Sequence, residues 1–207
     1  MYVDLRSRPG RTALVGLVIA FTPLLAASAS ATELHVPQEY PTIQAAIDAA
    51  VDGDTVLVAP GTYVGRVDLL GKRITVTGTG GAAVTVIDGA GAPGYVVLAT
   101  SGESVDTRLS GFTIRGGNGG MLVQGASLAI ESCVFADNTK SNGYGGGLAV
   151  FNGSPTITAC TFSGNYAVIG GGLYTEFSSA RVIDGVFVDN QAGYGAGAGF
   201  VAGAAPL

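Results

Sequence analysis

The chain has 207 residues, of which 47% are hydrophobic and 34 are glycine, so it can bury a core as one domain and is neither disordered nor collagen-like. So much glycine, with no tryptophan, favours tight turns and thin strands over a helical bundle. The formal net charge is −5, and it becomes −7 over residues 32–207, where 7 Lys and Arg face 14 Asp and Glu. This excess of acidic residues argues against binding to nucleic acid or to anionic membrane surfaces. It also argues against binding to polyanionic sugars, unless calcium bridges the sugar and the protein.

Residues 1–31 have the pattern of a secretory signal peptide. Three arginines precede an apolar run of about 13 residues, Ala13 to Leu25, and small residues lead up to Ala31. The run is shorter than the roughly 20 residues that a membrane span needs, and no later stretch is apolar for as long. We predict cleavage after Ala31 and an exported single domain, residues 32–207, that lies outside the cell or on its surface without a membrane span.

The exported part begins with a short strand, a helix and a second strand. Residues 33–36 and 55–58 are the strand candidates. Between them, Thr42 is a candidate N-cap for a helix from Ile43 to Ala50, whose apolar residues recur at i, i+3, i+4 and i+7. We expect this helix to cap the N-terminal end of the fold. Asp48, Asp52 and Asp54 lack the spacing of a calcium loop and are interpreted as solvated acids.

Further along, glycines separate short strand candidates at residues 67–69, 73–77, 84–87, 95–99 and 109–114. Residues 101–106 are polar enough for an exposed loop. Three near-copies of one phrase follow at residues 130–138, 157–165 and 182–190, each trailed by a glycine-rich run. Their phenylalanines, Phe135, Phe162 and Phe187, give steps of 27 and 25 residues, and a weaker copy around Phe112 lies upstream. Repeats of this length indicate a solenoid.

Within each copy, apolar residues alternate with small or polar ones, so one face of each strand points inward. Three strands and three turns in about 25 residues describe one coil of a parallel β-helix. The predicted fold is therefore all-β, a parallel β-helix with coils of roughly 21 to 27 residues and one short N-terminal helix. The sequence stops at Leu207 without a capping element, which predicts either a C-terminally incomplete chain or a last coil that associates with a partner.

Two sets of segments resemble known families. Residues 40–50, 53–63 and 85–89 resemble the opening of right-handed parallel β-helix proteins of the pectin lyase-like group, which holds pectin esterases, polysaccharide lyases and many non-enzymes. The Phe-x-x-Asn motifs at 135–138, 162–165 and 187–190, with Gly-Gly-Gly-Leu at 145–148 and 170–173, look like repeats of chlamydial polymorphic outer-membrane proteins. The first resemblance implies a right-handed β-helix, and the second implies a role in adhesion. The esterase and lyase catalytic patterns do not align with this sequence.

The repeats place like residues on successive coils. Asn138, Asn165 and Asn190 share one phase, where stacked asparagines hydrogen-bond each other and the turn backbone. The three phenylalanines also occupy equivalent positions in successive coils, and we expect them to form an aromatic stack that points inward. The alternative is that they form a platform that binds sugar. Cys133 and Cys160 are also one coil apart, about 4.8 Å between Cα atoms, so they form either a disulfide or two buried thiols.

The catalytic candidates are weak. Asp137 and Asp189 occupy the same position in coils that are two apart, so their backbones are about 9.6 Å from each other. This distance is near the wide end of the separation between the two catalytic carboxyl groups of inverting glycosidases. The alternative is a pair of exposed turn acids. Lys140 and Arg115 are potential catalytic partners of these acids, but nothing in the sequence places them nearby. No metal or other cofactor site is predicted, and calcium is expected only if the protein is a polysaccharide lyase.

The leading hypothesis is an exported, non-enzymatic repeat protein for surface display, adhesion or carbohydrate binding, with a polysaccharide or a cell-surface molecule as its partner. The first rival is a polysaccharide-degrading enzyme, a lyase or a glycoside hydrolase, that uses Asp137 and Asp189. The second rival is a structural segment of a larger multidomain protein. One scaffold hosts many sites, so the fold does not choose among them.

Overall fold

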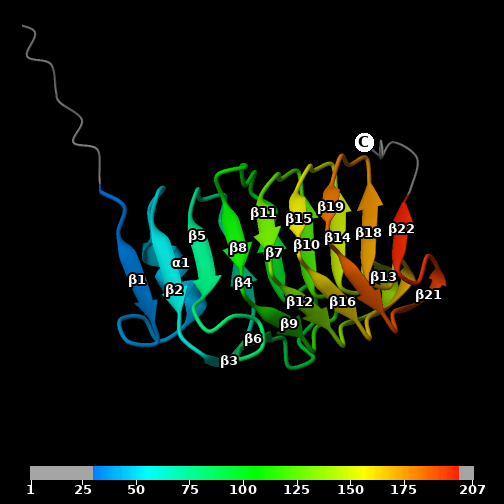
Figure 1. Cartoon of the computed structure of the whole chain (residues 1–207), viewed down its shortest axis with the longest axis horizontal. Helices are drawn as coiled ribbons and strands as arrows, with labels where there is room; N and C mark the ends of the chain where they lie inside the picture. The colour runs from blue at the N-terminus through cyan, green and yellow to red at the C-terminus, as the bar shows by residue number, and fades with distance from the viewer. Residues whose placement is uncertain (1–29, 201–207) are drawn as a thin grey trace, which may run out of the picture.

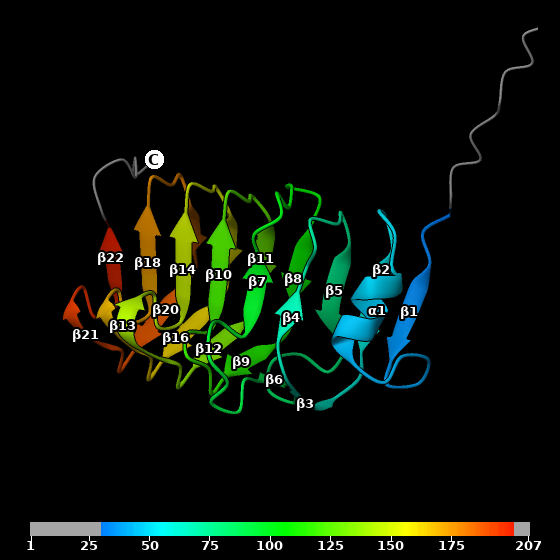
Figure 2. The same ribbon diagram turned by 180° about the vertical axis from the view of Figure 1, so that it is seen from behind.

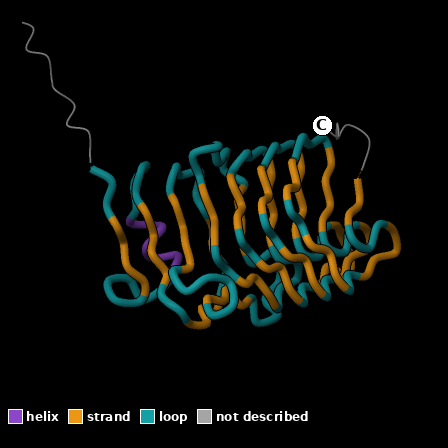
Figure 3. The backbone as a smooth tube through the Cα atoms, viewed as in Figure 1, coloured by secondary structure: helices purple, strands orange, loops and turns teal. Residues whose placement is uncertain are grey.

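The computed structural model describes residues 30–200 as a parallel β-helix with its coils stacked along one axis (Figures 1 and 3). The predicted signal peptide lies almost entirely outside the described residues, and so does the C-terminal end after residue 200. Every strand pairing is parallel, between strands of successive coils. The solenoid predicted from the repeats is confirmed.

Four sheets run along the solenoid. Sheet A contains β1 (Glu33–Val36), β2 (Thr55–Val58), β5 (Thr75–Gly78), β8 (Arg108–Ser110), β11 (Ala129–Glu131), β15 (Thr156–Thr158) and β19 (Arg181–Ile183). Sheet B contains β3 (Gly61–Val64), β6 (Thr85–Asp88), β9 (Thr113–Arg115), β12 (Val134–Ala136), β16 (Thr161–Ser163) and β20 (Val186–Val188). Sheet C contains β4 (Val67–Asp68), β7 (Val97–Ala99), β10 (Met121–Gln124), β14 (Leu148–Phe151), β18 (Leu173–Glu176) and β22 (Ala198–Phe200). Sheet D contains β13 (Thr139–Tyr144), β17 (Tyr166–Ile169) and β21 (Gln191–Tyr194).

The helix α1 (Ile43–Ala49) lies at the N-terminal end, where it packs against β1, β2 and β4 (Figure 2). Its buried stripe is the predicted one, and the Thr42 hydroxyl accepts the backbone N–H of Ala45 at 3.1 Å. Lys72 closes the other end, because its ammonium donates to the carbonyls of residues 47, 48 and 50 at 2.6 to 2.9 Å. A lysine there satisfies helix carbonyls that have no partner inside the helix and complements the helix dipole.

A ladder of asparagines, buried at 138 and 165 and half-buried at 190, connects the later coils. The Nδ2 group of Asn138 donates to Oδ1 of Asn165 at 3.1 Å, and Nδ2 of Asn165 donates to Oδ1 of Asn190 at 2.9 Å. Beside the ladder, the rings of Phe135 and Phe162 are stacked 5.0 Å apart and those of Phe162 and Phe187 are 4.7 Å apart. Phe135 and Phe162 have no exposed surface, so they cannot serve as a sugar-binding platform.

Two strand predictions were wrong. The stretch 109–114, expected as one strand, forms β8 and β9, because Gly111 adopts a left-handed conformation (φ 74°) and turns the chain from sheet A to sheet B. The last three coils contain four strands each, since the glycine-bearing stretch before sheet C pairs with its copies and forms sheet D. Local patterns do not report such pairing between residues about 25 positions apart in the chain.

Two acidic residues are buried although their segments were predicted to be exposed. Glu103, in the loop 101–106, is 1% exposed because its carboxylate accepts the backbone N–H groups of Gly71 and Ser101 at 2.8 and 3.1 Å. Asp54 is 5% exposed and accepts the backbone N–H groups of Val51 and Thr32, both at 2.8 Å. These hydrogen bonds, first that from Val51, lower the pKa of Asp54.

Candidate functional site

The outer face of sheet C carries two rows of side chains along the solenoid axis. In β14, Leu148 and Val150 point into the core, so Ala149 and Phe151 point outward. The parallel register extends each position into a row. The first row is Leu98, Leu122, Ala149 and Tyr174, and the second row is Gln124, Phe151 and Glu176. Along the axis the first row changes from aliphatic side chains to a tyrosine, and the second row has a phenylalanine between an amide and a carboxylate.

A bulge in sheet D precedes a tyrosine that packs onto this face. Lys140 pairs with Ala167 and Tyr144 pairs with Ile169, so β13 has two more residues between these pairs than β17 has. The same two residues account for the steps of 27 and 25 between the phenylalanines. The register is restored at Tyr144, which pairs with Ile169 as Ile169 pairs with Tyr194 in the next coil.

Three rings from three strands pack together at this place. The rings of Tyr144 and Tyr174 are stacked with centroids 4.6 Å apart, and Phe151 contacts both, edge-on to Tyr144 at 6.3 Å and tilted against Tyr174 at 5.4 Å. Tyr174 is 2% exposed, whereas Tyr144 remains 42% exposed and Phe151 is half-buried. We call Tyr144, Phe151 and Tyr174 the aromatic cluster. Its buried member fixes the orientation of the two rings that reach solvent.

Glu176 borders the aromatic cluster. Its Oε2 atom accepts the hydroxyl of Tyr174 at 3.1 Å. Burial, and then this contact with the carboxylate, raises the pKa of Tyr174 to about 12, so the hydroxyl stays protonated and continues to donate. No ion pair within residues 30–200 includes Glu176, which leaves its remaining lone pairs free to accept hydrogen bonds.

A second polar group supports the bulge. The ammonium of Lys140 lies 4.9 Å from the ring centroid of Tyr95 and 3.2 Å from Oδ1 of Asn118. The hydroxyl of Tyr95 donates to the carbonyl of Tyr144 at 2.6 Å, and burial raises the pKa of Tyr95. Gly143 leaves room for the stem of Lys140, because a Cβ there would lie 2.9 Å from its Cε. These contacts tie the bulge to the two preceding coils.

A family model described as a right-handed β-helix region matches residues 94–201, slightly more than half of the chain. The chain belongs to the right-handed β-helix family. The predicted fold class is thereby confirmed, handedness included. This β-helix is similar to a solved structure of a pectin methylesterase in complex with a hexasaccharide, with 13% identity, a TM-score of 0.40, and coverage of 80% of this chain and 68% of that one. No curated protein matches the chain. The resemblance to chlamydial repeats stays a prediction.

The weak catalytic candidates of this β-helix occupy turns. Asp137 and Asp189 are exposed corner residues between sheets B and D, in the left-handed conformation (φ 52° and 53°). Gly164 takes the same corner in the coil between them, and a Cβ on it would collide with Oδ1 of Asp137. No group of three or more His, Cys, Asp or Glu within residues 30–200 is arranged to hold a metal ion. No helix among these residues is long and apolar enough to cross a bilayer.

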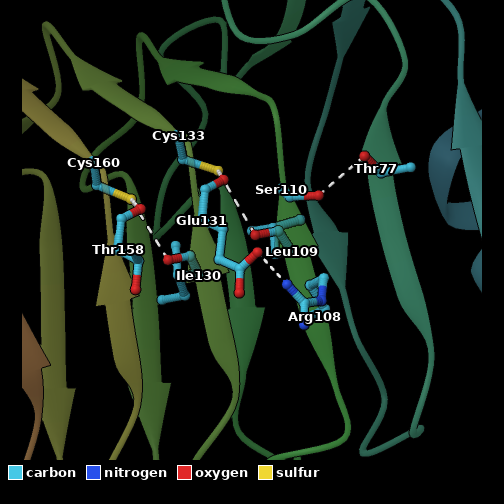
Figure 4. A network of polar contacts seen from close by, with 9 residues as sticks. All are labelled: Thr77, Arg108, Leu109, Ser110, Ile130, Glu131, Cys133, Thr158 and Cys160. Atoms are coloured by element: carbon cyan, nitrogen blue, oxygen red, sulfur yellow. Dashed lines mark hydrogen bonds and ion pairs between the residues drawn. The ribbon is translucent and has the colours of Figure 1, made fainter. Parts of the chain in front are cut away.

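The two cysteines of the β-helix lie side by side in the core as free thiols (Figure 4). Cys133 contacts the carbonyl of Glu131 at 3.4 Å, and Cys160 contacts that of Thr158 at 3.4 Å. The hydrogen bond with Cys160, and then burial, raises the pKa of Cys133. The structure therefore has two buried thiols where the sequence left a disulfide open.

The aromatic cluster is a candidate site that the sequence analysis did not predict. Its residues are 30 positions apart at most, yet they meet only because the register of successive coils brings three strands together. The one available signal was the unequal repeat step, which marks an insertion just before Tyr144.

Proposed function

We propose that this right-handed β-helix protein is exported and binds carbohydrate through the aromatic cluster, in a surface-display or adhesive role and without catalysing a reaction. The observation that carries the proposal is the exposed ring of Tyr144, held in place by Tyr174 and Phe151. A pre-oriented aromatic ring gives a large contact area at low entropic cost. Pyranose rings present C–H faces that stack on such a surface, and their hydroxyls need polar neighbours such as Glu176.

The proposal of export is based on the signal-peptide pattern of residues 1–31. The proposal of a non-enzymatic role is based on where Asp137 and Asp189 lie. Asp137 and Asp189 belong to exposed turns at the corner between sheets B and D rather than to the outer face of sheet C. Glycoside hydrolysis needs two carboxyl groups that flank the sugar that the protein holds, and these two acids lie at a corner instead of on the face that carries the aromatic cluster. In this proposal the protein binds its carbohydrate ligand and does not cleave it.

Binding to a polysaccharide panel, with and without calcium, tests the proposal, with new reducing ends and unsaturated products measured in the same samples. We expect binding without products, and about tenfold weaker binding by Tyr144→Ala. Tyr166→Ala is the matched control, because Tyr166 is equally exposed (41%) but alternation along β17 puts it on the opposite face of sheet D from the row of Tyr144. Product formation that is lost in Asp137→Asn or Asp189→Asn would identify an enzyme instead.

A further inference from the structure

The second outward row of sheet C contains an aromatic ring between an amide and a carboxylate. Gln124 pairs with Phe151 in the register of β10 and β14, and Phe151 pairs with Glu176 in the register of β14 and β18. Neighbouring strands are about 4.8 Å apart, so the amide and the carboxylate stand on either side of the ring with their backbones about 9.6 Å apart. A single pyranose ring laid on Phe151 would have hydroxyls directed toward both.

Each of the three residues retains exposed surface. Gln124 is exposed, and no hydrogen bond among residues 30–200 engages its side chain. Phe151 is half-buried and is held by Tyr144 and Tyr174. Glu176 is oriented by the hydroxyl of Tyr174 and keeps lone pairs free. The row therefore offers a stacking surface, an amide that donates and accepts, and a carboxylate that only accepts.

The charge of the row selects among sugars. Glu176 has no cation within ion-pair distance in the described part of the chain, so a sugar carboxylate or sulfate placed on Phe151 would meet an uncompensated like charge. The ammonium group of Lys140, in β13, contacts Tyr95 and Asn118. Sugar hydroxyls, in contrast, donate to a carboxylate in charge-assisted hydrogen bonds.

We propose that Gln124, Phe151 and Glu176 form a subsite for an uncharged hexose unit, with the sugar ring stacked on Phe151 and its hydroxyls bound by the flanking amide and carboxylate. This inference rests on the proposed carbohydrate-binding function and names the ligand class and the contact residues. It places the specificity of the β-helix in the second outward row, whereas Tyr144 of the aromatic cluster supplies contact area.

The test compares three polysaccharides, β-glucan, galactomannan and polygalacturonate, by calorimetric titration of the purified protein. We expect binding of at least one of the two neutral polymers and none of polygalacturonate. Phe151→Leu and Gln124→Ala should each weaken that binding about tenfold, and Glu176→Gln should weaken it while narrowing the discrimination against polygalacturonate. Tyr166→Ala should bind like the wild type, and circular dichroism and melting temperatures confirm that all variants are folded.

The outcomes separate the two proposals. Binding of a neutral polymer that depends on Tyr144 but not on Gln124, Phe151 or Glu176 would overturn the subsite and leave the proposed function intact. Tighter binding of polygalacturonate than of the neutral polymers would overturn the ligand class alone. Absence of binding to all three polymers and to the wider polysaccharide panel would overturn the subsite and the proposed function together.

Discussion

Replacing Asn165 by leucine would cut the asparagine ladder in its middle. Asn165 is fully buried, and its side chain makes four hydrogen bonds. Its Nδ2 group donates to the carbonyl of Phe135 at 2.8 Å and to Oδ1 of Asn190 at 2.9 Å. Its Oδ1 atom accepts the backbone N–H and the Nδ2 group of Asn138, both at 3.1 Å. Leucine has a similar volume, so the change removes the hydrogen bonds without opening a large cavity.

The expected cost follows from which groups lose their partners. The backbone N–H of Asn138 donates only to Asn165 among the described residues, so it becomes a buried donor without an acceptor, at about 1 to 3 kcal/mol. The Nδ2 group of Asn138 keeps the carbonyl of Ile114, and Oδ1 of Asn190 keeps the backbone N–H at position 165. Including these partial losses, we expect the free energy of unfolding to fall by about 2 to 4 kcal/mol.

Urea unfolding followed by circular dichroism measures this cost, with Asn142→Leu as the matched control. Asn142 is an exposed asparagine of the bulge, and a surface substitution of this kind changes stability by about 0.5 kcal/mol or less. Asn165→Leu should lower the urea midpoint clearly below that of the control. Equal midpoints for wild type and both variants would refute the assignment of stability to the ladder.

Three further predictions concern the N-terminal end and the cysteines. Lys72→Met should lower the free energy of unfolding by about 1 to 2 kcal/mol in urea melts, because three carbonyls at the end of α1 lose their donor; an unchanged midpoint would contradict this. The pKa of Asp54 is lowered on folding, so its stabilisation is complete above the unfolded value of about 3.9 and is lost as the pH falls below it. Melting temperatures between pH 5 and 3 should therefore fall less steeply for Asp54→Asn than for the wild type, and parallel curves would show that Asp54 makes no such contribution. Thiol titration under denaturant should find two free thiols, Cys133 and Cys160, that react slowly in the native protein; a count of zero would establish the disulfide.

Much of the fold could be predicted because each coil repeats the same local pattern. The helix at 43–50 was expected from its spacing and ends one residue earlier, at Ala49. The phases of the phenylalanines and asparagines followed from repeat steps alone. The split of 109–114 at Gly111 was missed because a glycine inside an apolar run is compatible with a strand until the neighbouring coils show a corner there.

The candidate site could not be predicted in the same way. Tyr144, Phe151 and Tyr174 have no shared sequence motif, and their contact depends on the pairing of β13 with β17 and of β14 with β18. The row of Gln124, Phe151 and Glu176 depends on pairings between residues 25 and 27 positions apart. The acids at Glu103 and Asp54 were misjudged for a related reason, since the backbone N–H groups that bury them come partly from distant segments.

The sequence by itself determined that the chain is a parallel β-helix, because inward apolar positions and turn glycines recur with every coil and only stacked coils bury them all. The tertiary structure alone decided which outward side chains become neighbours. Residues at outward positions do not have to fit the core, so their identity varies from coil to coil. Which of their side chains come into contact depends on the register between coils, and no local sequence pattern records that register. The binding surface proposed for this β-helix lies in those outward rows.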